Sequence, residues 1–304
     1  MTITPPILQE AVRDSLAAGA AGAEHAAEGG GNLFGELLHH VYDSREIEVP
    51  FAGHIELPQF APVHLGPLTL DFSLTKHVVF LWVAAIILIV IAVSAAVQNR
   101  RRTTPRGLGN LVEMFIIFIR DEVAIPNMGP GGVRYLPYLL TTFFFILIMN
   151  LSGLVPFGAT ATGNVSVTGG LALIAFIMIQ AAAIRAQGLG HYLKHLTGGV
   201  HWSLWPIMIP IEILGLFTKP FALMIRLFAN MIGGHIVIVS LIGLIFIFRS
   251  YLIAPVPIAF VLGINLLELF VAFLQAYIFT MLTSLFMGLG MQAAHEEESH
   301  GAGH

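Results

Sequence analysis

The stretch KPFALMIRLFANMIGGHIVIV (residues 219–239) places Arg226 in the middle of a strongly apolar run, with Asn230 and His235 close behind it. Such a run predicts a helix inside a membrane, where an arginine at mid-bilayer costs about 2.5–3.5 kcal/mol on insertion scales. Arginine also cannot shed its proton there. Because ionisable residues in membrane helices are functional by default, Arg226 predicts a functional site within the apolar part of the chain.

The composition is that of an integral membrane protein. Of 304 residues, 56% are hydrophobic and only 11% are charged, which is far from the usual soluble mixture. The chain has no cysteine, which excludes disulfides, thiol nucleophiles and thiolate metal sites. It shows no phosphate-binding glycine loop, metal-ligand spacing or nucleophile triad, so no cofactor is expected. Its short basic runs lack interleaved aromatic residues, which argues against nucleic acid as a partner.

The sequence divides into four parts. Residues 1–46 are predicted to be a flexible acidic N-terminal arm. Residues 47–75, where short apolar runs alternate with Pro and Gly, are expected to form extracytoplasmic loops or strand fragments. Residues 76–294 form the helical membrane domain, and residues 295–304 a polar C-terminal tail. The first thirty residues lack the basic start and apolar core of a conventional signal peptide.

Three spans of ordinary length are expected at Val78–Val97, Tyr135–Leu154 and Val165–Ile184. Four arginines between residues 100 and 106 follow the first span. By the positive-inside rule this loop is cytoplasmic, so the N-terminus is expected outside. Residues 107–125 are too short and too charged to span comfortably, which favours an amphipathic helix at the cytoplasmic interface.

The segments Leu204–Phe248 and Ile258–Met291 are overlong for single spans, at about 65–70 Å and about 50 Å if helical. The first either breaks into two spans at its prolines and glycines or forms one strongly tilted helix. Two consecutive overlong helices favour the second interpretation, a pair lying obliquely along a curved partner. The expected fold is therefore all-α, with five transmembrane helices, the last two long and tilted, and one interfacial helix. The odd number of spans places the C-terminus in the cytoplasm.

Polar residues fall on defined faces of these two long helices. Glu212, Lys219 and Arg226 are seven residues apart and form nearly one stripe, which Asn230 continues, whereas His235 points to the opposite side. On the last helix, Glu268 and Gln275 are again seven apart. If the helices are antiparallel, one layer pairs Arg226 with Gln275, and a layer nearer the outer face pairs His235 with Glu268.

The polar residues of the two long helices include one permanent cation, Arg226, and two groups able to titrate, His235 and Glu268. This combination suits proton conduction past a fixed electrostatic barrier. Structural alternatives remain open. Arg226 could be a structural charge paired with Glu212 or Glu268, His235 could be a hydrogen-bonded packing residue, and amides commonly join helices in bilayers.

Several motifs resemble those of one family. KPFALMIRLFANMIGGH (219–235) resembles the signature of the a subunit of rotary F-type ATP synthase, and LELFVAFLQAYIFTMLT (267–283) resembles the last helix of that subunit. NLSGLVPFG (150–158), NVSV (164–167) and Glu212 upstream of Lys219 match as well. The similarity runs from about Val78 to Gly290.

The resemblance implies a bacterial proton-channel stator in the cell inner membrane, with a ring of c subunits and the peripheral-stalk b subunit as partners. It implies that Arg226 faces the ring, favours the ionised ring carboxylate, and blocks a proton leak between two offset half-channels. Asn230 and Gln275 match polar positions that line this contact. Such a subunit is not catalytic alone.

One departure from the family pattern is informative. Well-known bacterial members carry glutamate at the position of His235 and histidine at that of Glu268, whereas here the two are exchanged, as in mitochondrial members. A reciprocal exchange keeps one carboxylate and one imidazole, which favours a facing pair in a proton access channel. The titratable pair also favours the proton as the coupling ion.

Two other functions predict features that this sequence lacks. A proton-coupled secondary transporter, with Arg226 binding an anionic substrate, predicts two related halves with interrupted helices, and no such repeat is found. An intramembrane hydrolase needs a nucleophile or metal constellation that these spans do not display.

Overall fold

The computed structural model describes residues 46–49, 53–56, 63–65, 68–70, 75–100, 107–155, 161–190, 192, 205–248 and 255–301. Most of the predicted acidic arm lies outside these residues. So do most of the arginine loop after the first span, the loop residues 156–160 and 193–204, Arg249, and the last three residues of the predicted tail.

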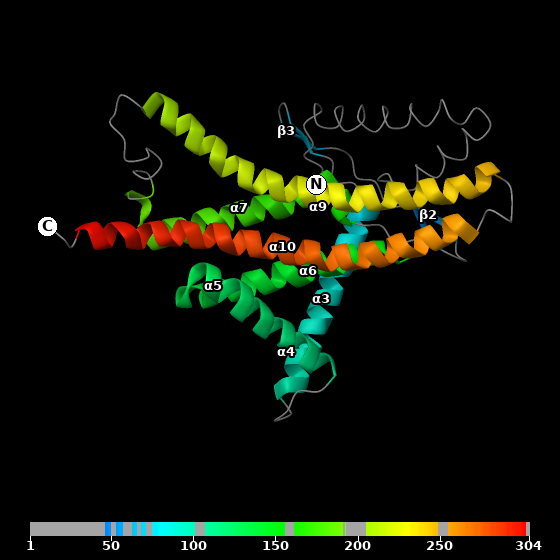
Figure 1. Cartoon of the computed structure of the whole chain (residues 1–304), viewed down its shortest axis with the longest axis horizontal. Coiled ribbons are helices and arrows are strands. Elements are labelled where there is room, and N and C mark those ends of the chain that lie inside the picture. Colours follow the sequence, from blue (N-terminus) through cyan, green and yellow to red (C-terminus); the bar gives the residue numbers. More distant parts are fainter. Residues whose placement is uncertain are drawn as a thin grey trace. The chain divides into compact units, whose positions relative to one another are not determined.

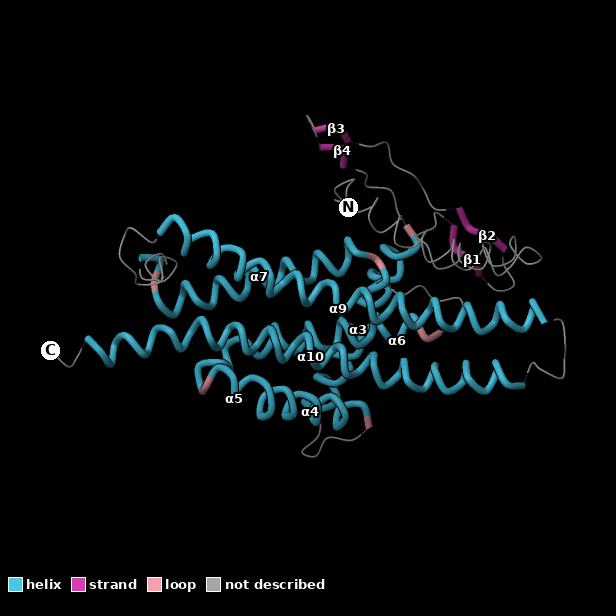
Figure 2. Tube along the Cα trace, turned by 45° about the horizontal axis from the view of Figure 1, so that its top comes forward, coloured by secondary structure: helices cyan, strands magenta, loops and turns pink. Residues whose placement is uncertain are grey.

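Four short strands precede the helices. β1 (Glu46–Val49) pairs antiparallel with β2 (Gly53–Glu56), and β3 (Val63–Leu65) pairs antiparallel with β4 (Leu68–Leu70). The predicted extracytoplasmic segment therefore contains two small hairpins, drawn in magenta in Figure 2.

The rest of the described chain is helical (Figures 1 and 2). Five helices are long and apolar enough to cross a membrane, which confirms the predicted fold class. They are α3 (Lys76–Arg100), α6 (Leu136–Gly153), α7 (Val165–Gln187), α9 (Trp205–Phe248) and α10 (Pro255–Gly301).

The segment between the first two spans is a series of short helices. It comprises α4 (Leu108–Phe118), a π-helix over Ile119–Ala124, α5 (Ile125–Met128) and a 3-10 turn over Pro130–Tyr135. Positive φ occurs at Gly107 (61°), just before α4, and at Gly129 (68°), between α5 and the 3-10 turn. Glycine is favoured at both positions because it lacks a Cβ. Leu108, Leu111, Met114 and Ile117 leave α4 with a large apolar exposed surface, as expected for a helix that lies at a membrane interface.

The question left open for residues 204–248 is settled by α9, which is one helix of 44 residues, about 66 Å long. Pro210 and Pro220 lie inside it, so both prolines are accommodated without ending the helix. The 47 residues of α10 extend to Gly301, and the backbone of most of the predicted polar tail therefore continues this helix.

The chain divides into two compact units, and each long helix contributes to both. One unit contains residues 1–83, 149–168 and 228–273, and the other contains residues 84–148, 169–227 and 274–304. In the first unit, buried Asn150 joins two elements. Its Nδ2 donates to the Ala272 carbonyl of α10 at 3.3 Å, and its Oδ1 accepts from the Thr162 hydroxyl at 2.8 Å.

In the second unit, the C-terminal half of α10 is held on two sides. The Ser284 hydroxyl donates to the Val123 carbonyl at 3.0 Å, and Phe118 lies against Tyr277 with ring centroids 5.6 Å apart. On the other side, the Gln187 side chain of α7 donates to the Gly290 carbonyl at 2.6 Å. These contacts fix α10 between α7 and the α4–α5 segment.

Candidate functional site

The ionisable stripe lies on a continuous helix. Glu212, Lys219 and Arg226 all belong to α9, so their spacing of seven residues keeps them within about 40° of one another around the helix. Arg226 is exposed on the isolated chain, and Glu212 is partly exposed. The arginine is therefore presented on the surface of a membrane helix and is not enclosed in the interior of its unit.

Lys219 fixes how this half of α9 meets α10. Its Nζ lies over the Phe286 ring, 5.2 Å from the centroid, a favourable cation–π arrangement. The two helices run in opposite directions (Figure 1). Seven residues after Lys219 on α9 is Arg226, and seven residues before Phe286 on the antiparallel α10 is Phe279, so these two residues lie at about the same level. Gln275 is one turn from Phe279. Gln275 is buried, with 2% of its surface exposed, and lies within about one turn of the level of Arg226.

Glu268 belongs to α10 and lies level with the turn of α9 that contains His235, as the sequence predicts. A Cβ added to Gly234 would be 2.7 Å from Glu268 Cδ and would also meet Oε1. The carboxyl group therefore occupies space that only a glycine leaves open. Glu268 is 8% exposed, and its Oε2 is buried without a hydrogen bond to any described residue. This placement brings a carboxylic acid to the backbone of α9 at the residue that precedes His235.

One residue of this region was missed by sequence reasoning. His77, in the first turn of α3, is 5% exposed and lies close enough to His235 to act on it electrostatically. Its sequence signal was the pair Lys76–His77 at the start of an otherwise uncharged span. In the sequence alone, such a pair is typical of the end of a membrane span, and only the structure shows that it is buried.

The remaining predicted residues occupy different settings. Asn230 is exposed on α9, one turn after Arg226. Glu212 lies near Tyr192, whose pKa is raised by burial and further by the Glu212 carboxylate. The Tyr192 hydroxyl in turn donates to Gln180 Oε1 at 2.5 Å. Glu212 thus belongs to a polar group at one end of the stripe, well separated along α9 from His235.

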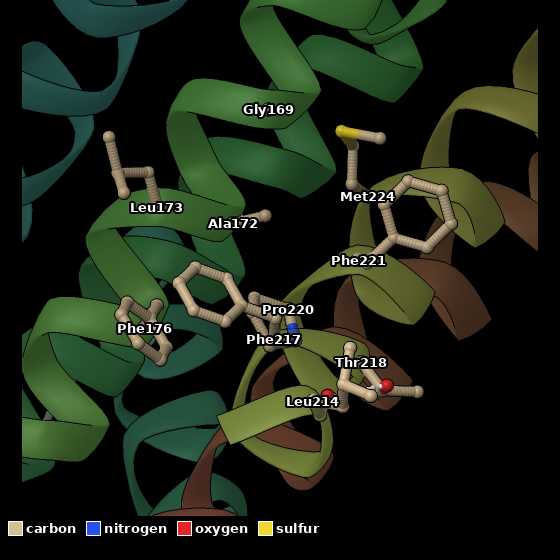
Figure 3. A pocket seen from close by; sticks show the side chains of 10 residues that line it. All are labelled: Gly169, Ala172, Leu173, Phe176, Leu214, Phe217, Thr218, Pro220, Phe221 and Met224. Carbon is tan, nitrogen blue, oxygen red and sulfur yellow. Dashed lines mark hydrogen bonds between the residues drawn. The ribbon is translucent and has the colours of Figure 1, made fainter. Parts of the chain in front are cut away.

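A cavity of about 400 Å³ lies between α7 and the first half of α9 (Figure 3). Helical periodicity places its α9 lining residues on the face opposite the stripe. At one end of it, Phe176 stacks on Phe217 with ring centroids 5.4 Å apart, and at the other Met224 lies beside Gly169. Its lining is almost wholly apolar: Gly169, Ala172, Leu173, Phe176, Leu214, Phe217, Thr218, Pro220, Phe221 and Met224. None of these lining residues has a titratable side chain, whereas the stripe on the other face of α9 carries three charged residues.

No three His, Asp or Glu side chains among the described residues are placed to share a metal ion. His235 and Glu268 are titratable side chains on the two long helices, and Arg226 is a permanent cation on the same pair of helices. The fold and the site together define a multi-pass membrane protein with ionisable residues on two overlong helices.

Comparison with known proteins gives the family. The sequence model of the ATP synthase A chain family matches residues 78–288, and the chain belongs to this family. It is 53% identical to ATP synthase subunit a of Chloroherpeton thalassium over 272 residues, which are 88% of this chain and 80% of that protein. It is also 48% identical to ATP synthase subunit a 2 of Chlorobaculum tepidum (97% and 83% covered) and 54% identical to ATP synthase subunit a of Myxococcus xanthus (77% and 78% covered).

Proposed function

We propose that this chain is the proton-channel stator of a rotary ATP synthase. The observation that carries the proposal is the exposed guanidinium of Arg226 on one unbroken apolar helix, in a chain that belongs to the ATP synthase A chain family. Exposing a permanent cation on a membrane helix is costly unless a partner with opposite charge meets it. A ring of c subunits, each with a carboxylate, provides such a partner.

In this mechanism Arg226 stabilises each ring carboxylate in its ionised form as that carboxylate passes. The proton leaves on one side, and the fixed cation prevents a second proton from crossing directly. His235 and Glu268 deliver protons from the outer side, while Glu212 lies on the cytoplasmic path. Asn230 and Gln275 line the contact with the ring. The chain does no catalysis by itself, and the b subunit of the peripheral stalk holds it against rotation.

The proposed orientation follows from charge. The N-terminus lies outside and the C-terminus in the cytoplasm, because the arginine-rich loop after the first span is predicted to be cytoplasmic. In this orientation His235 and Glu268 lie nearer the outer end of α9 and α10 than Arg226 does, and the two half-channels are offset across the arginine.

Arg226→Ala tests the proposal most directly. In the assembled complex in membrane vesicles, we expect proton-driven ATP synthesis to fall to background, because nothing then favours the ionised ring carboxylate. Arg226→Lys should recover little, since an ammonium group can lose its proton where arginine cannot. Arg185→Ala, which removes an exposed arginine at the end of α7, is the matched control and should leave synthesis intact.

Contact with the ring is tested separately. The chain has no cysteine, so Asn230→Cys introduces a unique thiol one turn from Arg226. We expect it to crosslink to a cysteine on the carboxylate-bearing helix of the c subunit. Near-normal coupled synthesis in Arg226→Ala, together with no crosslink from residue 230, would refute the assignment.

The secondary transporter is the competing function. It predicts substrate uptake by the purified chain reconstituted without c subunits, which the stator does not perform.

A further inference from the structure

His77 is a buried titratable residue that the mechanism above does not use. It lies in the first turn of α3 and is 5% exposed. Burying an imidazole in a membrane protein is costly unless polar groups surround it. Ionisable residues within spanning segments commonly mark an ion pathway. The surroundings of His77 therefore decide whether it is more than a boundary residue.

The compact unit that contains His77 also contains the two residues predicted to carry protons. Residues 1–83 and 228–273 belong to one compact unit, which holds His77 from α3, His235 from α9 and Glu268 from α10. His77 acts electrostatically on His235, and the Glu268 carboxyl fills the space beside Gly234. Lys76 is the other ionisable side chain on the described helices of this unit. His77 thus lies near His235 and in the same unit as Glu268.

We propose that His77 is a third proton-carrying residue of the outer access path, acting before His235 and Glu268. This inference rests on the proposed function. In each transfer the His77 ring binds one proton that comes from the outer water and releases one proton toward His235. The ring therefore ends each transfer with the protonation it began with, and no other reactant is needed.

A structural role for His77 predicts different behaviour from a proton-carrying role. If His77 only fills space and donates a hydrogen bond, glutamine serves as well, because it is polar and of similar reach. If His77 carries protons, glutamine fails and another titratable side chain partly succeeds. The comparison of His77→Gln with His77→Glu separates the two roles.

The experiment measures passive proton flux through Fo in membranes stripped of F1, as a function of pH. We expect His77→Gln to slow the flux several-fold. We expect His77→Glu to recover part of it with a pH midpoint shifted downward, since glutamate titrates below histidine. Val78→Ala, in the same helical turn, should match the wild type. Co-purification of the c subunit with each variant verifies assembly.

A second measurement leaves His77 in place. Leu81→Cys places a thiol one helical turn after His77, on the same face of α3. Trp82→Cys places a thiol at nearly the same depth but on the opposite face, where the wild-type tryptophan is 63% exposed. A membrane-impermeant, water-soluble thiol reagent applied from the outer side should react at residue 81 and not at residue 82. Equal reaction, or none at residue 81, would show that no water path reaches His77 and would overturn the inference.

The inference and the proposed function fail in distinguishable ways. If Glu268→Gln slows the flux while His77→Gln keeps the wild-type rate and pH profile, His77 is not on the path and the stator function stands. If Arg226→Ala remains coupled and Glu268→Gln leaves the flux unchanged, the proposed function itself is wrong.

Discussion

At the scale of the residue, neighbouring glycines on α9 have opposite surroundings. A Cβ at Gly234 would meet the Glu268 carboxyl, whereas a Cβ at Gly233 would have no atom within 4 Å apart from its own helix. Both lie in the middle of a helix, where glycine is otherwise unfavourable by up to about 1 kcal/mol relative to alanine. Of these two glycines, only Gly234 is required by packing, because the Glu268 carboxyl occupies the space that a Cβ would fill.

Gly234→Ala should therefore displace the Glu268 carboxyl from its place against α9, one residue before His235. Because the displaced atoms are the end of a flexible side chain, the complex should still assemble, while proton flux through Fo falls. Gly233→Ala is the control and should keep wild-type flux. Equal flux in the two variants, measured by quenching of a pH-sensitive dye in vesicles, would mean that this position of the carboxyl is not needed.

At the scale of the element, the π-helix explains how the α4–α5 segment is attached. A π-helix widens the helix and can leave carbonyls to be satisfied from outside. The Val123 carbonyl receives two donors, the Asn127 side chain at 2.8 Å and the Ser284 hydroxyl of α10 at 3.0 Å. Four residues after Ser284, Gly288 lies against the Asn127 backbone. Small residues at this spacing allow membrane helices to approach closely.

Gly288→Ala should loosen this attachment, because the new Cβ would meet the Asn127 backbone with its carbonyl carbon 2.8 Å away. We expect a loss of about 1–3 kcal/mol in the free energy of unfolding, seen as a lower thermal midpoint in detergent. Gly263→Ala, on the same helix with open space around it, should instead be neutral or gain up to about 1 kcal/mol. Identical midpoints would contradict the close contact.

At the scale of the whole molecule, the separation of polar and apolar faces is the main feature. The stripe of Glu212, Lys219 and Arg226 occupies one face of α9, and the apolar cavity against α7 occupies the opposite face. This arrangement separates the face of α9 that packs against α7 from the face that carries the charges. In the proposed function, the charged face is the one that meets the ring.

The proposed orientation gives a prediction at this scale. Because the wild-type chain has no cysteine, Thr2→Cys and His304→Cys each carry a unique thiol. An impermeant thiol reagent should label Thr2→Cys from outside intact cells and His304→Cys only in inverted vesicles. Labelling of both positions from the same side would require an even number of spans and would contradict the topology.

The spans, their approximate ends and the stripe on α9 could be predicted from the sequence because they depend on local quantities. Transfer free energy over some twenty residues identifies a span, and helical periodicity places Glu212, Lys219 and Arg226 on one face whatever lies around them. The same reasoning left open whether residues 204–248 form one helix or two, because proline permits a bend without requiring it.

The other features of the site depend on which helices pack together. Three pairings join residues far apart in the sequence. His77 lies near His235, 158 positions away; the Glu268 carboxyl lies against Gly234, 34 positions away; and Ser284 donates to Val123, 161 positions away. No local pattern encodes such pairs, since each helix offers several faces and packing selects one of them. The sequence alone therefore determined which residues are costly to place in a membrane, and the packing of the helices determined which of them meet.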